Sequence, residues 1–195
     1  PTPPVRAQPS SQAAGQAPVF AARGFSPDAA VPAAGSAVAQ VRAALAGGDH
    51  TAARQLAQAT LSHATDPDEV AELRWLAAVA CEGLGDAPGR AAYLAALTAS
   101  GHPLAPYAAL QLAGSVATSD PARAVRLTSS LTGNWGGAWT ARMTEARALA
   151  ALGRNEEAIA RYREIVAATP ADLAAISAGL PLINLLAARP DVASK

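Results

Sequence analysis

Three histidines and one cysteine are the side chains that could ligate a transition metal in this chain: His50, His63, Cys81 and His102. They lie far apart in sequence and do not form the paired spacings of zinc sites, so we expect no metal centre. A lone thiol on an apolar helix is typical of a small core residue. His50 and His102 fall in predicted turns, where polar side chains are usually exposed, and His63 ends a predicted helix.

Six glutamates on predicted helices are the candidates for a general acid or base: Glu72, Glu82, Glu145, Glu156, Glu157 and Glu164. Solvated helix faces or ion pairs explain each of them, as with Glu157 four residues before Arg161. The chain also has no Gly-x-Ser-x-Gly elbow, P-loop or dinucleotide-binding glycine pattern. We therefore expect a non-enzymatic chain with no catalytic residue and no cofactor.

The segment "GNWGGAWT" places Trp135 and Trp139 among glycines. Indole rings in such a setting can stack on sugar rings or hold a protein partner, because they offer a large contact area at low entropic cost. Alternatively, Trp139 opens a helix and packs between helix pairs, and Trp135 covers the end of the core. The sequence favours this packing role, since the Ala-rich core has few other large side chains.

The composition indicates an all-α fold. Hydrophobic residues make up 51% of the 195 residues and aromatic residues 4%, with Ala and Leu dominant and β-branched residues sparse. The 15 basic residues balance the 15 acidic ones, which argues against nucleic acid as a partner. No apolar run reaches the roughly 18 residues that a membrane span needs.

Residues 1–33 are rich in proline, and we expect them to form a disordered linker or tail. Phe20 and Phe25 in this tail either dock onto the folded part or stay isolated. A helical domain is predicted over residues 34–187, followed by a short tail over 188–195. Its expected helices are 35–46, 51–63, 68–84, 88–100, 104–117, 121–132, 138–152, 155–168 and 171–187.

Helix ends are marked by capping residues. Asp68, Asp120 and Asn155 occupy expected N-cap positions, and Gly85 and Gly153 stand just past helix ends, where a left-handed residue is needed.

A period of 34 residues relates the turns between these helices. Gly85 and Gly153 are 68 positions apart, and Ser119 with Asp120 falls midway between them. Small residues in the second helices repeat as Ala124 and Ala158, and Gly136 and Pro170 keep the same spacing. The turn at Gly48 lies 37 residues before Gly85, so the first repeat contains a small insertion.

Residues 139–170, "WTARMTEARALAALGRNEEAIARYREIVAATP", resemble a tetratricopeptide repeat. Ala146 and Ala158 stand at the small positions of the two helices, Gly153 in the turn and Tyr162 at the aromatic position of the second helix. The other repeats are degenerate, and Arg90 stands where the second-helix alanine is expected. The resemblance implies a right-handed superhelix (solenoid) of helix pairs, whose first helices line a concave face that holds a protein or peptide partner.

A narrower resemblance covers about residues 70–187. The order "LRWLAAVACEGLGD", "HPLAPYAALQLA", "DPARAVRLTSSL" and "EARALAALGRNEEAIARYREIV" is similar to the N-terminal superhelical region of soluble lytic murein transglycosylases, periplasmic enzymes that cleave peptidoglycan. The catalytic glutamate of that family lies in a separate domain whose motifs do not occur here.

Two functions follow as alternatives. The first is a non-catalytic scaffold that binds a protein or peptide, in the periplasm or cell envelope or otherwise in the cytoplasm. The second is the helical region of a lytic transglycosylase, with peptidoglycan as a partner. The repeat register predicts a concave face made of Arg42, Glu72, Trp75, Glu82, Thr140, Met143 and Arg147.

The last predicted helix, 171–187, takes the place of a first helix whose partner helix is missing. Its apolar residues surround the helix too widely for one neighbour to cover, and Pro181 is expected to kink or divide it. We expect this end to be covered by more chain, by a second copy through self-association, or by the region of Phe20 and Phe25.

Overall fold

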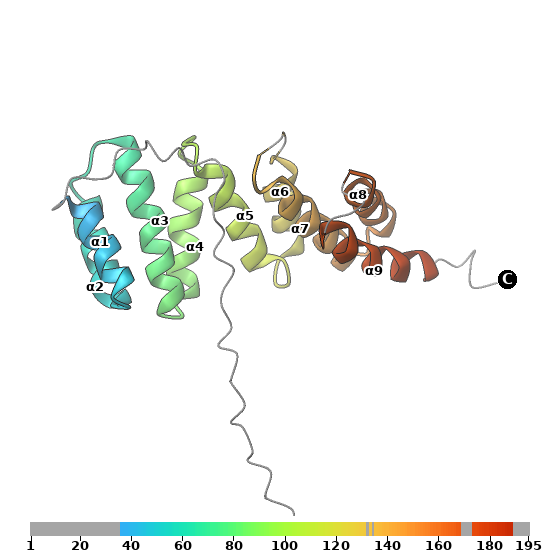
Figure 1. The fold of residues 1–195 in the computed structure, drawn as a ribbon, viewed down its shortest axis with the longest axis horizontal. Helices are drawn as coiled ribbons and strands as arrows, with labels where there is room; N and C mark the ends of the chain where they lie inside the picture. The colour runs from blue at the N-terminus through green and yellow to red at the C-terminus, as the bar shows by residue number, and fades with distance from the viewer. Residues whose placement is uncertain (1–35, 132, 134, 169–172, 189–195) are drawn as a thin grey trace, which may run out of the picture.

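The computed structural model describes residues 36–131, 133, 135–168 and 173–188, and within these ranges the chain forms helices and no strand (Figure 1). The helices are α1 (Ala37–Ala46), α2 (His50–Leu61), α3 (Pro67–Gly83), α4 (Ala87–Thr98), α5 (Ala105–Val116), α6 (Pro121–Ser129), α7 (Ala138–Ala151), α8 (Asn155–Ala168) and α9 (Leu173–Ala187). All nine expected helices are confirmed. The largest difference in an end is at α6, which was expected to reach residue 132 and stops at Ser129.

Several expectations fall outside the described residues. They concern the tail over 1–33 with Phe20 and Phe25, the repeat-end residue Pro170, and all of the final tail except its first residue. Pro181 lies inside α9 and does not divide it, because the helix runs without interruption from Leu173 to Ala187.

Aspartates cap the N-terminus of the second helix in three successive helix pairs. Asp49, Asp86 and Asp120 each accept a hydrogen bond at 2.9 Å from the backbone N–H three residues further on, which satisfies a donor of the first helical turn. The prediction for Asp120 is confirmed. The prediction for Asp68 is wrong: Asp66 caps α3 and accepts from the N–H of Asp68, since Pro67 takes the first helical position.

Left-handed glycines end the first helix of three pairs. Gly48, Gly85 and Gly153 have φ values of 77°, 69° and 72°. The N–H of the next residue bonds in each case to a carbonyl five positions back, which closes the helix end; the pairs are Asp49 with Ala44, Asp86 with Cys81, and Arg154 with Leu149. Ser119 differs, because no described non-glycine residue has a positive φ.

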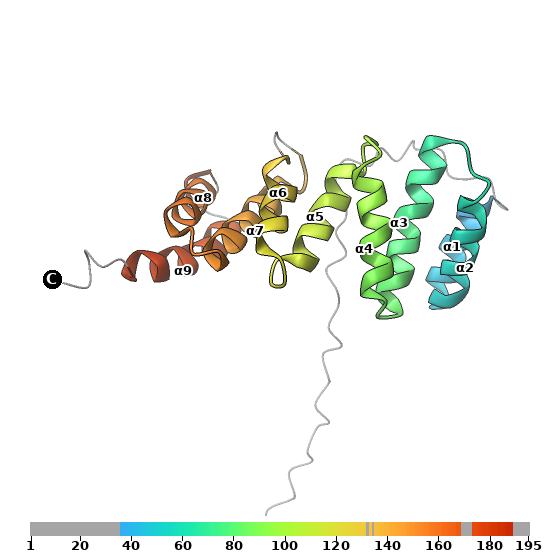
Figure 2. The ribbon, with the colours of Figure 1, turned by 180° about the vertical axis from the view of Figure 1, so that it is seen from behind.

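The helices pack mainly on their chain neighbours. Each helix contacts the next from α1 to α9, and α1 also contacts α3, as α5 contacts α7. Figures 1 and 2 show the result, a single elongated row with α1 at one end and α9 at the other. Because the helices pack mainly on their chain neighbours, helices all along the row present side chains to solvent.

Alanine makes close packing possible along this row. Ala124, Ala146 and Ala158, expected at the small positions, are fully buried. Larger side chains fill the space that they leave: Leu73 packs among α1, α2 and α3, and Tyr162 lies in the cluster formed by α7, α8 and α9. The core is therefore a series of small clusters between neighbouring helices, not one central core.

Candidate binding surface

Two residues predicted for the concave face meet across helices α1 and α3. A guanidinium nitrogen of Arg42 donates to Oε1 of Glu72, thirty residues away in sequence. Both side chains are partly exposed, so the pair is screened by water and contributes little to stability. The pair shows that α1 and α3 lie side by side on this surface. We call the surface of Arg42, Glu72, Trp75, Val79 and Glu82 the odd-helix face.

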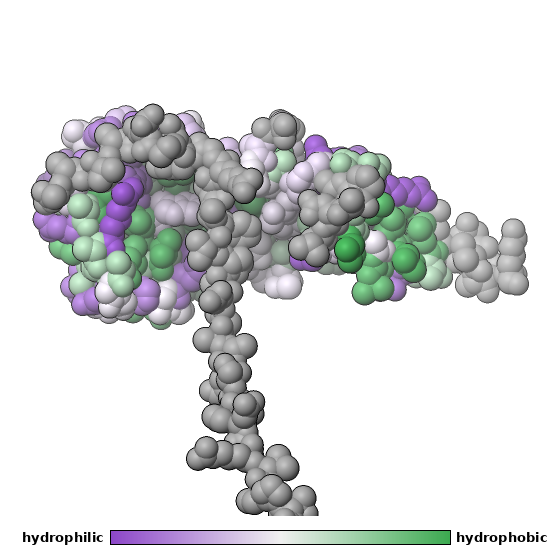
Figure 3. Space-filling model, in the orientation of Figure 1, coloured by the Kyte–Doolittle hydropathy of each residue, from purple (hydrophilic) through white to green (hydrophobic). Residues whose placement is uncertain are grey.

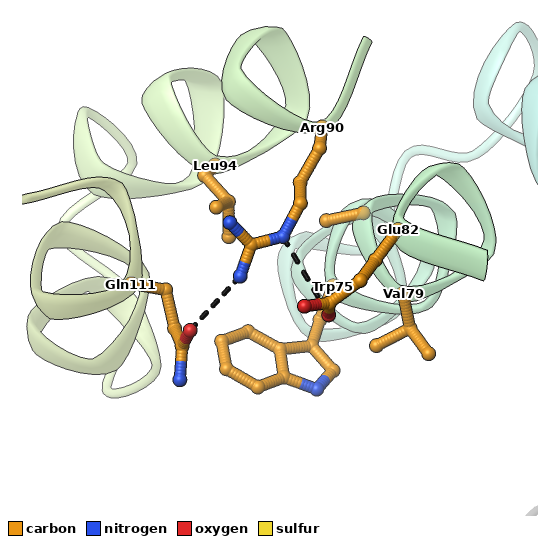
Figure 4. A pocket seen from close by; sticks show the side chains of 7 residues that line it. Trp75, Val79, Glu82, Arg90, Leu94 and Gln111 are labelled. Atoms are coloured by element: carbon orange, nitrogen blue, oxygen red, sulfur yellow. Dashed lines mark hydrogen bonds and ion pairs between the residues drawn. The ribbon is translucent and has the colours of Figure 1, made fainter. Parts of the chain in front are cut away.

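A hollow of about 70 Å³ lies at the side of this face that borders α4 and α5. Trp75, Ala78, Val79 and Glu82 of α3 line one side, and Arg90 and Leu94 of α4 with Gln111 of α5 line the other (Figure 4). Its walls are apolar and its rim is polar. A hollow of this size can take one aliphatic side chain of a partner.

Arg90 organises the rim of the hollow. Its guanidinium lies between α3 and α5, donating to Oε1 of Gln111 at 2.9 Å and standing 3.6 Å from a carboxylate oxygen of Glu82 (Figure 4). The side chain of Arg90 is 17% exposed, whereas that of Glu82 is 65% exposed. Arg90 is therefore held between Gln111 and Glu82, and the Glu82 side chain faces solvent.

The sequence contained a sign of this arrangement. Arg90 stands where a tetratricopeptide-like second helix has alanine, and a long cation at a close-packed position must find acceptors nearby. Val79, Leu94 and Gln111 carry no such sign, because only the packing of three helices brings them together.

The predicted residues of α7 are divided between surface and core. Thr140 and Arg147 are exposed, as a binding face requires. The prediction for Met143 is wrong: it is 8% exposed and belongs to the cluster that includes Ala178 of α9. Residues of α8 and α9 in this cluster cover Met143.

Both tryptophans of "GNWGGAWT" pack within the fold. The ring of Trp135 meets that of Tyr107 edge to face with centroids 5.0 Å apart, and it lies so close to Gly137 that a Cβ there would clash with the indole. Trp139 packs on the α7–α8–α9 cluster, with the guanidinium carbon of Arg142 4.6 Å from its ring centroid. These contacts favour the packing role.

His50, His102 and Cys81 contact neighbouring parts of the fold, whereas His63 is exposed and lies beyond the end of α2 at Leu61. Contrary to the expectation of an exposed turn residue, His50 begins α2 and its ring lies against Gly83, leaving room for no Cβ there. Nδ1 of His102 accepts from the N–H of Leu104, and its Nε2 lies 3.2 Å from the carboxylate of Asp68. Burial raises the pKa of the Cys81 thiol, which makes it a poor nucleophile.

Most of the glutamates considered as general acids form ion pairs with arginines. Glu145 is buried and lies 3.2 Å from Arg161, which also binds Glu164. The expected pair of Glu157 with Arg161 is replaced: Glu157 forms two hydrogen bonds of 2.6 Å with Arg154, three residues before it. These hydrogen bonds hold the pKa of Glu157 below its ordinary value.

In the described part of the chain, no group of three His, Cys, Asp or Glu side chains could hold a metal ion. No helix in the same ranges has the length and apolar character that crossing a membrane requires.

Comparison of the chain with protein-family models, with curated proteins and with solved structures gave no match in any of the three.

Proposed function

We propose that the chain is a non-catalytic, tetratricopeptide-like scaffold that binds a protein or peptide partner on its odd-helix face. The observation that carries the proposal is the hollow beside Trp75, with apolar walls and the charged rim of Glu82 and Arg90. An extended peptide could place an aliphatic side chain in the hollow and its backbone or polar groups on the rim.

The order of the helices supports this proposal. In a solenoid of helix pairs, the first helices line one face, and here α1 contacts α3 while α5 contacts α7. Thr140 and Arg147 of α7 would then extend the same face beyond α5, in a right-handed superhelix. The cell envelope of a bacterium is the proposed location, on the resemblance alone.

Selection of binding peptides from a random library tests the proposal. Peptides selected on the 195-residue chain should lose their affinity for a Trp75→Ala, Arg147→Ala double variant. Because Trp75 also packs on neighbouring helices, Val79→Glu provides a second variant: Val79 is 37% exposed and lines the hollow, so a charge there should block the ligand and leave the helices intact.

A matched control uses Arg126→Ala with Arg163→Ala, which removes exposed arginines of α6 and α8. Peptides that bind all variants alike would reject the odd-helix face as the site. The lytic transglycosylase alternative predicts instead that the chain sediments with purified peptidoglycan sacculi.

A further inference from the structure

Three side chains of α3 give one side of the hollow an apolar surface that ends on a charge. Trp75, Val79 and Glu82 are four and three residues apart, a spacing that places them on the same side of a helix. Figure 4 shows all three projecting from α3 beside the hollow. Trp75 is half-buried, and the Glu82 carboxylate lies in solvent at the rim. A ligand side chain in the hollow therefore meets an indole ring, a branched aliphatic wall and a carboxylate.

Glu82 has room for a second cation. The Nε of Arg90 lies 3.6 Å from Oε2 of Glu82, longer than a hydrogen bond, and the guanidinium donates instead to Gln111. The Glu82 side chain is 65% exposed and that of Arg90 only 17%, so Arg90 approaches the carboxylate from the protein side. A carboxylate has two oxygens and accepts several donors. The solvent side of Glu82 is thus left to a ligand.

The helices around the hollow carry more acidic than basic residues. Residues 36–116, which include α1 to α5, contain seven carboxylates and four arginines, a net formal charge of −3. Residues 117–188 contain seven arginines and six carboxylates, a net formal charge of +1. On the face seen in Figure 3, hydrophilic residues lie among hydrophobic ones over α1 to α4, whereas hydrophobic residues gather over α9. This charge distribution attracts a cationic ligand to the part of the row that holds the hollow.

Other classes of side chain match the hollow less well. An acidic side chain would meet the exposed Glu82 before the more buried Arg90. An uncharged aliphatic side chain would fill the apolar part but remove water from the Glu82 carboxylate without replacing its hydrogen bonds, which costs free energy. Lysine and arginine combine both parts, because an aliphatic stem carries the charged group. The indole of Trp75 adds to this preference, since tryptophan is the aromatic ring that attracts cations most strongly.

We propose that the hollow is a subsite for a lysine or arginine side chain of the partner, with the stem packed on Trp75 and Val79 and the cation bound to Glu82. The inference rests on the proposed function, because it names the ligand of the same odd-helix face. The partner segment is then an extended peptide with an accessible basic residue. The stem, not the cation, lies on Val79, so the carboxylate of Val79→Glu removes the apolar wall and weakens binding.

Selection from a random heptapeptide library on the 195-residue chain tests the subsite. One position of the selected peptides should be enriched in lysine or arginine. Replacing that residue by norleucine keeps a flexible aliphatic stem and removes the charge. The replacement should weaken binding at least ~5-fold, the loss expected for a partly exposed ion pair with a cation–π contact. The difference between the two peptides should shrink at about 1 M salt, where the Debye length is about 3 Å.

The matching change on the chain is Glu82→Gln, which removes the charge from an exposed side chain and preserves its shape. The affinity of this variant for the peptide with the basic residue should fall about 5-fold. Its affinity for the norleucine peptide should not fall, because the two changes remove the same contact. Glu156→Gln is the control, since it makes the same charge change on an exposed residue of α8, toward the other end of the row. It should leave both affinities unchanged.

The Trp75→Ala, Arg147→Ala variant distinguishes a wrong subsite from a wrong binding face. Peptides that bind this variant as tightly as the native chain would overturn both the subsite and the proposed function, because the ligand would lie elsewhere. Peptides that lose affinity for this variant, yet bind the native chain equally well with norleucine in place of the basic residue, would overturn the subsite alone. Equal effects of Glu82→Gln and Glu156→Gln would also overturn the subsite, since the attraction would then come from the net charge of the chain.

Discussion

Replacement of two glycines by alanine should change stability in opposite directions. Gly85 has a φ of 69° in the turn between α3 and α4, whereas Gly114 lies within α5 with open space around an added Cβ. A left-handed conformation costs a residue with a Cβ about 1–2 kcal/mol. The lower entropy of alanine in the unfolded chain offsets about 0.4–1 kcal/mol. Gly85→Ala should therefore lower the free energy of unfolding by about 1 kcal/mol.

Gly114→Ala has no strain to offset and should raise the free energy of unfolding by about 0.5–1 kcal/mol. For a urea slope of about 2 kcal/mol/M, the unfolding midpoints of the two variants should differ by about 0.8–1 M. Urea unfolding followed by circular dichroism measures this difference. Equal midpoints would mean that Gly85 does not adopt the left-handed turn, and the description of the helix-pair turns would be wrong.

Three further predictions concern single side chains. Asp86→Ala removes both the N-cap of α4 and the acceptor of Arg54, and it should lower the free energy of unfolding by about 1–2 kcal/mol in a thermal melt; an unchanged melt would contradict the cap. Cys81 should react with a thiol reagent only as urea unfolds the chain, since the thiol is buried and its pKa is raised. The pKa of Glu157 should rise when Arg154→Ala removes its partner, as an NMR titration would show. In the native chain, the lowered pKa of Glu157 stabilises the folded state at pH values above the pKa of this carboxyl in the unfolded chain. That stabilisation is lost as the pH falls through the pKa of the folded state.

The number and position of the helices were predictable, because turn residues mark nearly every boundary. Gly85 and Gly153 could be recognised from spacing alone, since only glycine adopts their backbone conformation at low cost. Asp68 was assigned wrongly because two aspartates flank Pro67, and the sequence pattern fits either one. The cap depends on which side chain reaches the free N–H.

The proposed binding surface was less predictable, because it depends on contacts between helices. Glu72 and Arg42 lie thirty residues apart, and the helical register alone predicted that they share one face. Met143 shares the register of Thr140 and Arg147 but is buried in the cluster of α7, α8 and α9, and a repeat count does not show which side of α7 the following helices cover. Gln111 reaches the hollow because α5 packs against α4, and there it accepts a hydrogen bond from Arg90.

The location of a bound ligand tests the proposed function most directly. A peptide selected against the chain and carrying a photo-reactive phenylalanine analogue would be cross-linked and its adducts mapped by mass spectrometry. Adducts should fall on exposed residues of α3 around Trp75 and Val79 and on α7 near Thr140 and Arg147. Adducts confined to the exposed sides of α2, α6 and α8, with none on α3, would contradict binding on the odd-helix face.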